Sequence, residues 1–427
     1  MKPETILQEA INYQETIIRQ RRYLHTHPGC GFDIAETKDF VKKELEAMGY
    51  APEDCGRSGL VALAGGKRTA ANGDGQNAAG KKEGKVFLLR ADMDGLPIRE
   101  EADVDFPSTN GKMHACGHDM HTAMLLGAAR ILKDHEDEIE GTVKLMFQPA
   151  EEVFQGSHDM IEAGLLENPK VDAALMIHVM AGMPFPAGTV VVSAPGVSAP
   201  AADLFEIRVQ GKGCHGSMPN TGIDPLNAAA HILIALQEIQ TRELPIGEKA
   251  VLTIGMMNAG NAPNVIPDVV VMGGSLRTFD GQTREFIKKR LAEIAEGTAQ
   301  TFRASAELRF TSGCPTLIND KELSACVGGY VKELLGPGKA FTVEELNAMS
   351  ASSGEGGESG SSKSSGSEDF AYVSQEVPAI MLALAAGQPE KGYVYPQHHP
   401  MVKFDEEALA GGSAVYAYTA MRWLEEH

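Results

Sequence analysis

The sequence predicts an α/β protein with two domains, and three observations lead to that prediction. The chain has 427 residues, which is too long for one ordinary hydrophobic core. Apolar segments of strand length alternate with amphipathic helices over most of the chain, as is typical of a sheet covered by helices. Between residues 204 and 310 the order becomes strand-helix-strand-strand-helix-strand, which indicates a small α+β sandwich inserted in the larger domain.

The composition excludes several classes of partner. A hydrophobic fraction of 43% and a charged fraction of 22% fit a soluble globular protein, and a net charge of -20 argues against nucleic acid or anionic membrane, which bind clustered basic residues. No apolar run approaches the roughly 20 residues of a membrane span, and the segment up to Arg22 has no signal-peptide core. We therefore expect a cytoplasmic protein with no membrane partner. Scattered cysteines indicate free thiols rather than a disulfide framework: Cys30, Cys55, Cys116, Cys214, Cys314 and Cys326.

The first part of the chain is expected to hold two helices and then two strands. The predicted elements are a helix to about Leu24, a helix over 34–48, and strands over 61–64 and 85–89. The segment Gly66 to Gly84 is rich in Gly, Ala, Asn and Lys, so we expect a mobile loop that joins the two strands in a hairpin. His25 and His27, in the motif L-H-T-H-P, are interpreted as surface histidines at a helix end.

Two carboxylates follow the second of these strands, in R-A-D-M-D-G-L-P. Asp92 and Asp94 stand where open α/β sheets usually place functional groups, at the carboxyl end of a strand. The alternative, an aspartate that caps or closes a turn, stays open at this point.

The stretch M-H-A-C-G-H-D-M-H-T, from Met113 to Thr122, concentrates metal-ligating side chains. Cys116 and His118 flank Gly117, and thiolate and imidazole are preferred ligands of zinc and similar divalent ions. A helix follows over 124–132, and Asp119 lies where a helix N-terminus favours negative charge. A buried cysteine beside surface histidines at a helix start is the alternative interpretation.

Two further strands deliver candidate ligands. A buried strand that begins near Gly141 stops at Pro149 and is followed by Glu151 and Glu152. Adjacent residues point in different directions, so one carboxylate can bind a metal ion while its neighbour faces a water molecule beside it. A solvated strand end is the alternative for both glutamates. The strand over 173–179 carries His178, which by itself is typical of a core residue.

The remaining elements follow the same periodicities. We expect strands over 204–209, 250–257, 269–276, 304–310 and 379–384 and helices over 224–238, 283–298 and 406–424. The Ser/Gly run from Ser350 to Ser367 is expected to be a flexible loop leading into Glu368. The motif Y-P-Q-H-H-P then brings His398 and His399.

Together these motifs resemble a known family. In order they are L-H-T-H-P-G-C-G-F, L-R-A-D-M-D-G-L-P, M-H-A-C-G-H-D-M-H-T-A, F-Q-P-A-E-E, M-I-H-V, G-K-G-C-H-G-S-M-P, N-V-I-P-D and S-E-D-F. They are similar to the metal-dependent amidohydrolase branch of the M20 peptidases, which includes N-acyl-amino-acid, hippurate and auxin-conjugate hydrolases. The resemblance implies a two-segment catalytic domain with a mixed central sheet flanked by helices, over 1–194 and 314–427. It also implies an inserted α+β sandwich that acts as lid and dimerisation domain, over 195–313.

The resemblance also implies a site with two divalent metal ions per chain, zinc, manganese, cobalt or nickel. Matched motif by motif, Glu151 would be the general base, and the metal ligands would be Cys116, His118, Glu152, His178 and His398. Of the two adjacent histidines, His398 rather than His399 matches the family's L-H-x-P pattern.

Three residues of the inserted domain match substrate-binding positions of the family. His215, in G-C-H-G-S-M-P, would donate a hydrogen bond to the oxyanion, from the lid of the second subunit of a homodimer. Asn264 and Arg277 would hold the substrate carboxylate. The alternative for His215 is a histidine that caps a turn at the edge of the lid.

The expected activity is hydrolysis of the amide bond of N-acyl amino acids or similar small amide conjugates. Two divalent cations can acidify water and polarise the carbonyl, while Glu151 takes the proton and passes it to the leaving nitrogen. Asp92 and Asp94 would then orient imidazoles or stiffen the strand end. The alternative enzyme is a dipeptidase or aminoacyl peptidase of the same superfamily. Alternatives of another class are a metal-binding protein without catalysis and a homologue that only binds ligands.

The chain departs from the family pattern at a few positions. Gly29 and Cys30 stand where a glutamate usually follows Pro28, Met120 replaces a common glycine, and the Ser/Gly run looks like an insertion. Every expected ligand remains in place. The departures therefore leave the preferred acyl group and amino acid open.

Overall fold

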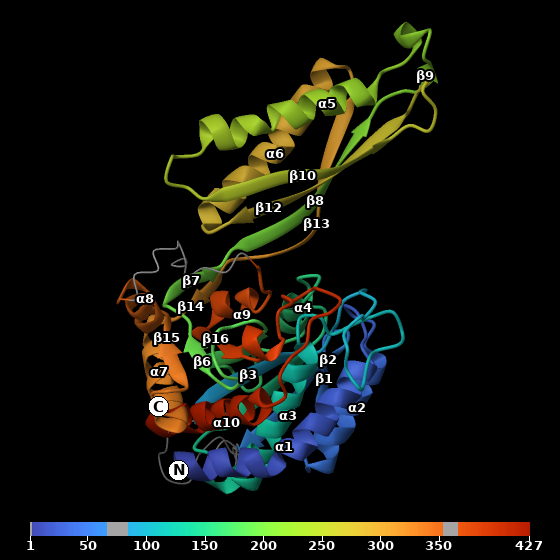
Figure 1. The fold of residues 1–427 in the computed structure, drawn as a ribbon. Coiled ribbons are helices and arrows are strands. Elements are labelled where there is room, and N and C mark those ends of the chain that lie inside the picture. Colours follow the sequence, from blue (N-terminus) through green and yellow to red (C-terminus); the bar gives the residue numbers. More distant parts are fainter. Residues whose placement is uncertain (1, 66–83, 353–365) are drawn as a thin grey trace, which may run out of the picture. The chain divides into compact units, whose positions relative to one another are not determined.

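The computed structural model describes residues 2–65, 84–352 and 366–427, which form two compact units (Figure 1). Of the described residues, the first unit holds 2–65, 84–198, 318–352 and 372–427, and the second holds 199–317 and 366–371. The first unit is thus built from segments that lie far apart in the sequence. The Ser/Gly run falls mostly outside the described residues, as does nearly all of the predicted loop over 66–84.

The first unit is organised around a mixed sheet. Among the described residues this sheet has eight strands, in the order β1-β2-β4-β3-β5-β16-β6-β15. The strands are β1 (Glu53–Cys55), β2 (Gly59–Gly65), β3 (Val86–Asp92), β4 (Thr142–Gln148), β5 (Ala173–Met180), β6 (Val190–Val192), β15 (Ala340–Thr342) and β16 (Ala379–Ala385). β4, β3, β5 and β16 run parallel, whereas β2 is antiparallel to β4 and β6 is antiparallel to β16. The mixed central sheet predicted from the sequence is therefore confirmed.

The parallel strands explain where polar groups gather. Every residue of β3 and β4 is buried, as expected for parallel strands that are covered on both faces. Because these strands share a direction, their carboxyl ends meet at one edge of the sheet. The segments that follow Asp92, Gln148, Met180 and Ala385 consequently begin at the same edge.

The predicted hairpin of the strands over 61–64 and 85–89 is wrong. β4 lies between them, antiparallel to β2 and parallel to β3. The segment that joins β2 to β3 is far longer than the two-residue turn of a tight hairpin, so it does not oblige the two strands to pair. β3 is therefore free to pair in parallel with β4 and β5.

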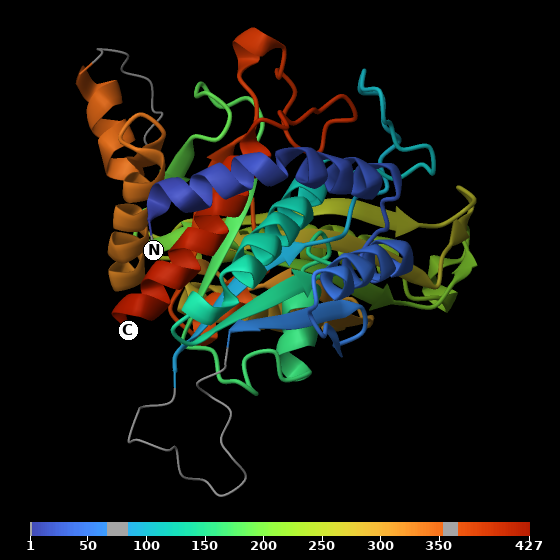
Figure 2. The ribbon, with the colours of Figure 1, turned by 90° about the horizontal axis from the view of Figure 1, so that it is seen from below.

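Helices cover this sheet. They are α1 (Pro3–Thr26), α2 (Ala35–Ala47), α3 (His118–Asp134), α4 (Gly156–Glu162), α7 (Lys321–Leu335), α8 (Val343–Ser352), α9 (Ala371–Glu376) and α10 (Ala408–Glu426). α3 and α10 contact β3, and α1 packs across both of them (Figure 2). No helix of the described residues is long and apolar enough to cross a membrane.

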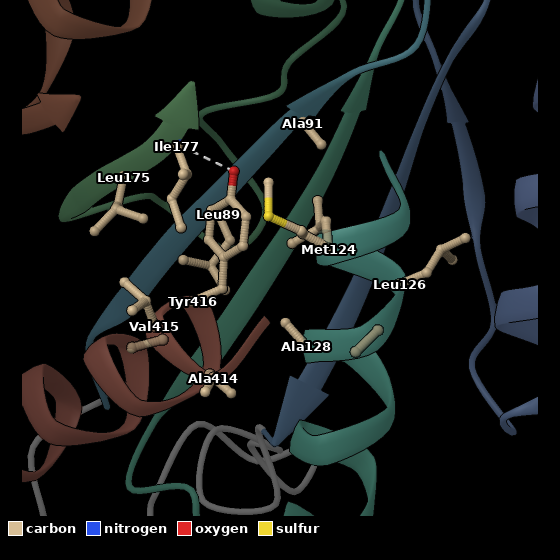
Figure 3. Close-up of a cluster of buried hydrophobic side chains, with 14 of the residues drawn as sticks. Leu89, Ala91, Met124, Leu126, Ala128, Leu175, Ile177, Ala414, Val415 and Tyr416 are labelled. Atoms are coloured by element: carbon tan, nitrogen blue, oxygen red, sulfur yellow. Dashed lines mark hydrogen bonds between the residues drawn. The ribbon is translucent and has the colours of Figure 1, made fainter. Parts of the chain in front are cut away.

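The core of the first unit joins its N-terminal part to its C-terminal helix. In the close-up of Figure 3, Leu89 and Ile177 of the sheet lie beside Met124 of α3 and Tyr416 of α10. The Tyr416 hydroxyl donates to the Arg90 carbonyl at 2.7 Å and accepts from the Ile177 amide at 3.0 Å. One fully buried phenol from the last helix thus bonds two neighbouring parallel strands.

Tyr416→Phe is expected to lower the free energy of unfolding by about 1–3 kcal/mol, since it removes two hydrogen bonds from buried backbone groups. The measurement is a urea titration followed by circular dichroism. Tyr13→Phe is the matched control, because its hydroxyl bonds Asp134 at 2.5 Å at the surface. An equal loss in both variants would contradict the role assigned to the buried phenol.

The second unit is the predicted α+β sandwich. Within residues 199–317 the strands β8 (Ala201–Gln210), β10 (Ala250–Ala259), β12 (Val269–Thr278) and β13 (Ser305–Cys314) form an antiparallel sheet in the order β10-β12-β8-β13. Burial alternates along β8, and α5 (Pro225–Ala235) and α6 (Gly281–Thr301) supply the rest of this core. A short ladder joins β9 (Cys214–His215) to β11 (Val265–Ile266). β7 (Gly196–Ala199) pairs with β14 (Leu317–Asn319) where the chain passes from one unit to the other.

Candidate metal centre

The loop that carries Cys116 turns sharply into α3 at Gly117. This residue has φ of 92°, a region that favours glycine, and a Cβ added to it would lie 2.4 Å from the Val179 side chain. α3 begins at the next residue, His118. Only glycine fits this turn, which places the thiol and the imidazole on either side of it.

The structure brings all five predicted ligands together in two groups. Cys116, His118 and His178 form one group, and Cys116, Glu152 and His398 form the other, with the ligand atoms of each group within 4.8 Å of one another. Cys116 belongs to both groups. The donor atoms come from the carboxyl edge of the parallel strands and from the distant segment that carries His398.

Two of the histidines are oriented by backbone carbonyls. His118 Nδ1 lies 2.8 Å from the Asp94 carbonyl, and His178 Nδ1 lies 2.7 Å from the Val179 carbonyl, so each Nδ1 donates a proton. This tautomer leaves Nε2 of each ring as a lone-pair donor, and His178 Nε2 lies 3.6 Å from Cys116 Sγ. These contacts prepare both rings to bind a metal ion through Nε2.

Asp94 also fixes the turn that carries the two glutamates. Its carboxylate accepts from the Glu151 amide at 3.0 Å and from the Glu152 amide at 3.3 Å. Ala150, just before them, has φ of 56°, a conformation that non-glycine residues adopt rarely and mostly at functional sites. The turn directs both carboxylates to one place, since His118 Nε2 lies 3.9 Å from Glu151 Oε2 and 3.9 Å from Glu152 Oε1.

His121 lies beside these ligands but is not one of them. Its Nδ1 lies 2.6 Å from Asp92 Oδ1, and its Nε2 accepts from the Val179 amide at 2.8 Å. Both ring nitrogens are therefore occupied, although Asp92, His118 and His121 also form a compact donor group. The contacts from Asp92 through His121 to the Val179 amide fix the backbone next to His178. Sequence reasoning gave His121 no role, although its position one helical turn after His118 was a usable signal.

The charges of the cluster fit divalent cations. Burial opposes ionisation of Cys116, but His178 and His118 hold the pKa of its thiol well below the usual range. Burial, and then the Cys116 thiolate, raise the pKa of Glu152 to about 8. Within the described residues, buried His118 Nε2 and Glu152 Oε1 have no hydrogen-bond partner. Cations bound among these atoms would give His118 Nε2 and Glu152 Oε1 a partner. They would also offset the electrostatic repulsion between the Cys116 thiolate and the Glu152 carboxylate.

Of the three predicted residues of the second unit, the structure brings His215 and Asn264 together, whereas Arg277 lies near the opposite end of β12. His215 pairs with Val265, and its Nδ1 accepts from the Ser217 amide at 3.1 Å, which leaves Nε2 as the donor of an exposed ring. Asn264 is its neighbour, since its carbonyl accepts from the Gly216 amide at 2.8 Å. Arg277, on β12, donates to Ser367 Oγ at 2.7 Å.

The interpretation of His25 as a surface histidine is wrong. Its side chain is 3% exposed, because α1 continues to Thr26 and keeps His25 on the buried face with Arg21 and Leu24. His27 is 37% exposed, as expected.

Comparisons with known proteins identify relatives over nearly the whole chain. The family model described as Peptidase family M20/M25/M40 matches residues 88–422. The chain is 35% identical to an IAA-amino acid hydrolase ILR1-like 2 of Arabidopsis thaliana, over 96% of the chain and 85% of that protein. It is 32% identical to an N-acetyl-L-cysteine deacetylase of Bacillus subtilis, over 97% of the chain and 89% of that protein. The crystal structure of the Bacillus subtilis YXEP protein, a dinuclear metal-binding peptidase of the M20 family, superposes with a TM-score of 0.72 and 31% sequence identity. The superposition covers 97% of this chain and 99% of that protein's chain.

Proposed function

Because the chain belongs to peptidase family M20/M25/M40, in its amidohydrolase branch, it is a hydrolase of that family, and we propose that it cleaves the amide bond of N-acyl amino acids or similar small conjugates. We further propose that two divalent ions per chain take part. Cys116, His118 and His178 would hold one ion, and Cys116, Glu152 and His398 the other. Zinc, manganese, cobalt and nickel suit this mixture of thiolate, imidazole and carboxylate.

The observation that carries this proposal is the sharing of Cys116 between two donor groups beside Glu151. A thiolate shared by both groups would allow two ions to act on one small substrate. A protein that only stored metal would need no further carboxylate beside the ligands, whereas Glu151 is buried there and its amide is bonded to Asp94.

The chemistry divides between the ions and the chain. When bound, divalent cations supply polarisation of the amide carbonyl and a lower pKa of water. Glu151 would accept the proton of the attacking water and then donate it to the leaving nitrogen. Asp94 holds this carboxylate in place through the backbone of the turn, and Asp92 and His121 hold the strand end beside His178. The buried position of Glu151 keeps bulk water from competing for the proton.

The substrate class is proposed from relatives named for hydrolysis of IAA–amino acid conjugates and for deacetylation of N-acetylcysteine. The test is purified protein with added manganese, zinc or cobalt, incubated with a panel of N-acyl amino acids and unblocked dipeptides. We expect release of the amino acid from N-acyl substrates. Cleavage of unblocked dipeptides alone would favour the dipeptidase alternative, and retained ligand binding without any turnover would favour a binding protein.

We also propose a homodimer in which His215 of one subunit serves the metal site of the other. His215 suits an oxyanion donor, since Ser217 fixes its Nδ1 as acceptor and leaves Nε2–H exposed. Asn264 and Arg277 would hold the substrate carboxylate. A cytoplasmic location fits the six unpaired cysteines, all in described ranges.

A mixture of inactive His215→Ala and inactive Glu151→Gln subunits is expected to regain activity after exchange, because one site of the hybrid dimer would be intact. Activity of the mixture against each variant alone is the measurement. Proven exchange without recovery, or a monomer at assay concentration, would rule out the shared site.

A further inference from the structure

The motif L-H-T-H-P, at the end of α1, has no role in the chemistry proposed above. Its first histidine, His25, is buried between two carboxylates. Nδ1 lies 2.9 Å from Asp119 Oδ2, and Nε2 lies 3.0 Å from Glu100 Oε1. The ring therefore joins α3 to the segment 97–112, which contains no helix or strand.

On the α3 side, the His25 ring shares the Asp119 carboxylate with Arg21. Arg21 Nε lies 2.7 Å from Asp119 Oδ2, and the Arg21 side chain is 3% exposed. Asp119 directly follows His118 and lies within the hydrogen-bonded first turn of α3. Asp119 would keep its position without His25, because Arg21 and the first turn of α3 both hold it.

On the other side of the ring, the contact with Glu100 connects His25 to the loop that carries the proposed ligand His398. Glu100 Oε2 accepts from the Ser108 amide at 2.6 Å, and the next residue, Glu101, donates its amide to the Pro400 carbonyl at 2.8 Å. Pro400 belongs to the loop of His398, a residue with φ of 66° and a side chain 54% exposed. A ring that is more than half exposed has few packing contacts of its own, so contacts of its loop help to position it. These contacts include the one at Pro400, a 2.9 Å bond from the His398 amide to the Ala115 carbonyl, and a 3.0 Å bond from Gln397 Nε2 to the Val179 carbonyl.

We propose that His25 is a positioning residue for the metal group of Cys116, Glu152 and His398, acting through Glu100, Glu101 and Pro400. The inference rests on the two-ion site proposed above. Because Asp119 has other support and the segment 97–112 has none from secondary structure, loss of His25 should loosen the His398 loop and leave the group of His118 and His178 in place.

The test is metal binding to full-length His25→Gln, measured by calorimetric titration of the metal-depleted protein with cobalt and by elemental analysis. We expect one of the two ions to bind about 10- to 100-fold more weakly, the usual cost of removing a partner outside the ligand set, while the other keeps its affinity. His27→Gln is the matched control from the same motif, because the His27 side chain is 37% exposed and its contacts are with Tyr23, Thr26 and Glu36 rather than with Asp119 or Glu100. It should bind both ions as the wild type does.

Glu100→Ala provides a second, independent variant. It removes the bonds from the Glu100 carboxylate to His25 and Ser108 but leaves Arg21, His25 and Asp119 in place, so it should also weaken one ion selectively. Wild-type affinities for both ions in either folded variant would overturn the proposal. Lower thermal stability with both affinities unchanged, or equal weakening of both ions, would show a merely structural role and overturn it as well. If the wild type itself binds fewer than two ions, the two-ion site fails first, and this inference fails with it.

Discussion

Glu151→Gln is expected to lower turnover at least about a hundredfold while the protein keeps its full metal content. The substitution preserves the shape of the side chain and the hydrogen bond from the backbone amide of residue 151 to the Asp94 carboxylate. It removes the carboxylate that accepts the proton of water. General bases typically contribute about 10²- to 10⁴-fold. Steady-state kinetics on the best N-acyl substrate, with elemental analysis of the same sample, measures both quantities.

Glu152→Gln is the informative comparison, because it alters the neighbouring carboxylate of the same turn. Glu152 lies in the group of Cys116 and His398, so this variant should lose metal as well as activity. Near-normal turnover in Glu151→Gln would refute the assignment of the base. Metal loss in Glu151→Gln equal to that in Glu152→Gln would mean that Glu151 is a ligand instead.

Cys116→Ala should have the largest effect on metal binding of any single substitution in the site. Cys116 is the ligand that both donor groups share, whereas His178 and His398 each belong to one of these groups. We expect Cys116→Ala to weaken both ions by more than the roughly 10- to 100-fold that follows loss of a partner outside the ligand set, and to abolish activity at physiological metal concentrations.

His178→Ala and His398→Ala are the controls for Cys116→Ala. Each should weaken one ion much more than the other, and titration with cobalt distinguishes the two patterns. Retention of two tightly bound ions by Cys116→Ala would disprove the shared thiolate and with it the proposed arrangement of the site.

Much of the fold could be predicted from periodicity, because long apolar strands and amphipathic helices have distinct repeats. The strand over 173–179 and the helix over 406–424 appear close to their predicted places, as β5 and α10. Strand order could not be predicted in the same way. Nothing local in the sequence shows that β4 separates β2 from β3, because pairing depends on contacts between distant residues.

The candidate site was predictable where ligands follow strands directly. Glu151, Glu152 and His178 lie at or just after strand ends, and parallel strands bring such positions to one edge. The burial of His25 was not predictable from its motif, because it depends on which face of α1 meets α3. The link from Glu100 to the His398 loop has no sequence signal either, as it consists of side-chain and backbone contacts across irregular segments.

The position of β16 in the sheet has a consequence for synthesis on the ribosome. This strand comes late in the chain, yet it lies between β5 and β6, which are made much earlier. Until it emerges, β5 presents an open apolar edge, and unpaired edges of this kind are prone to pair with other chains. His398 and α10 emerge later still. The nascent protein therefore cannot bring both donor groups together, or bury this sheet, before His398 and α10 have been translated.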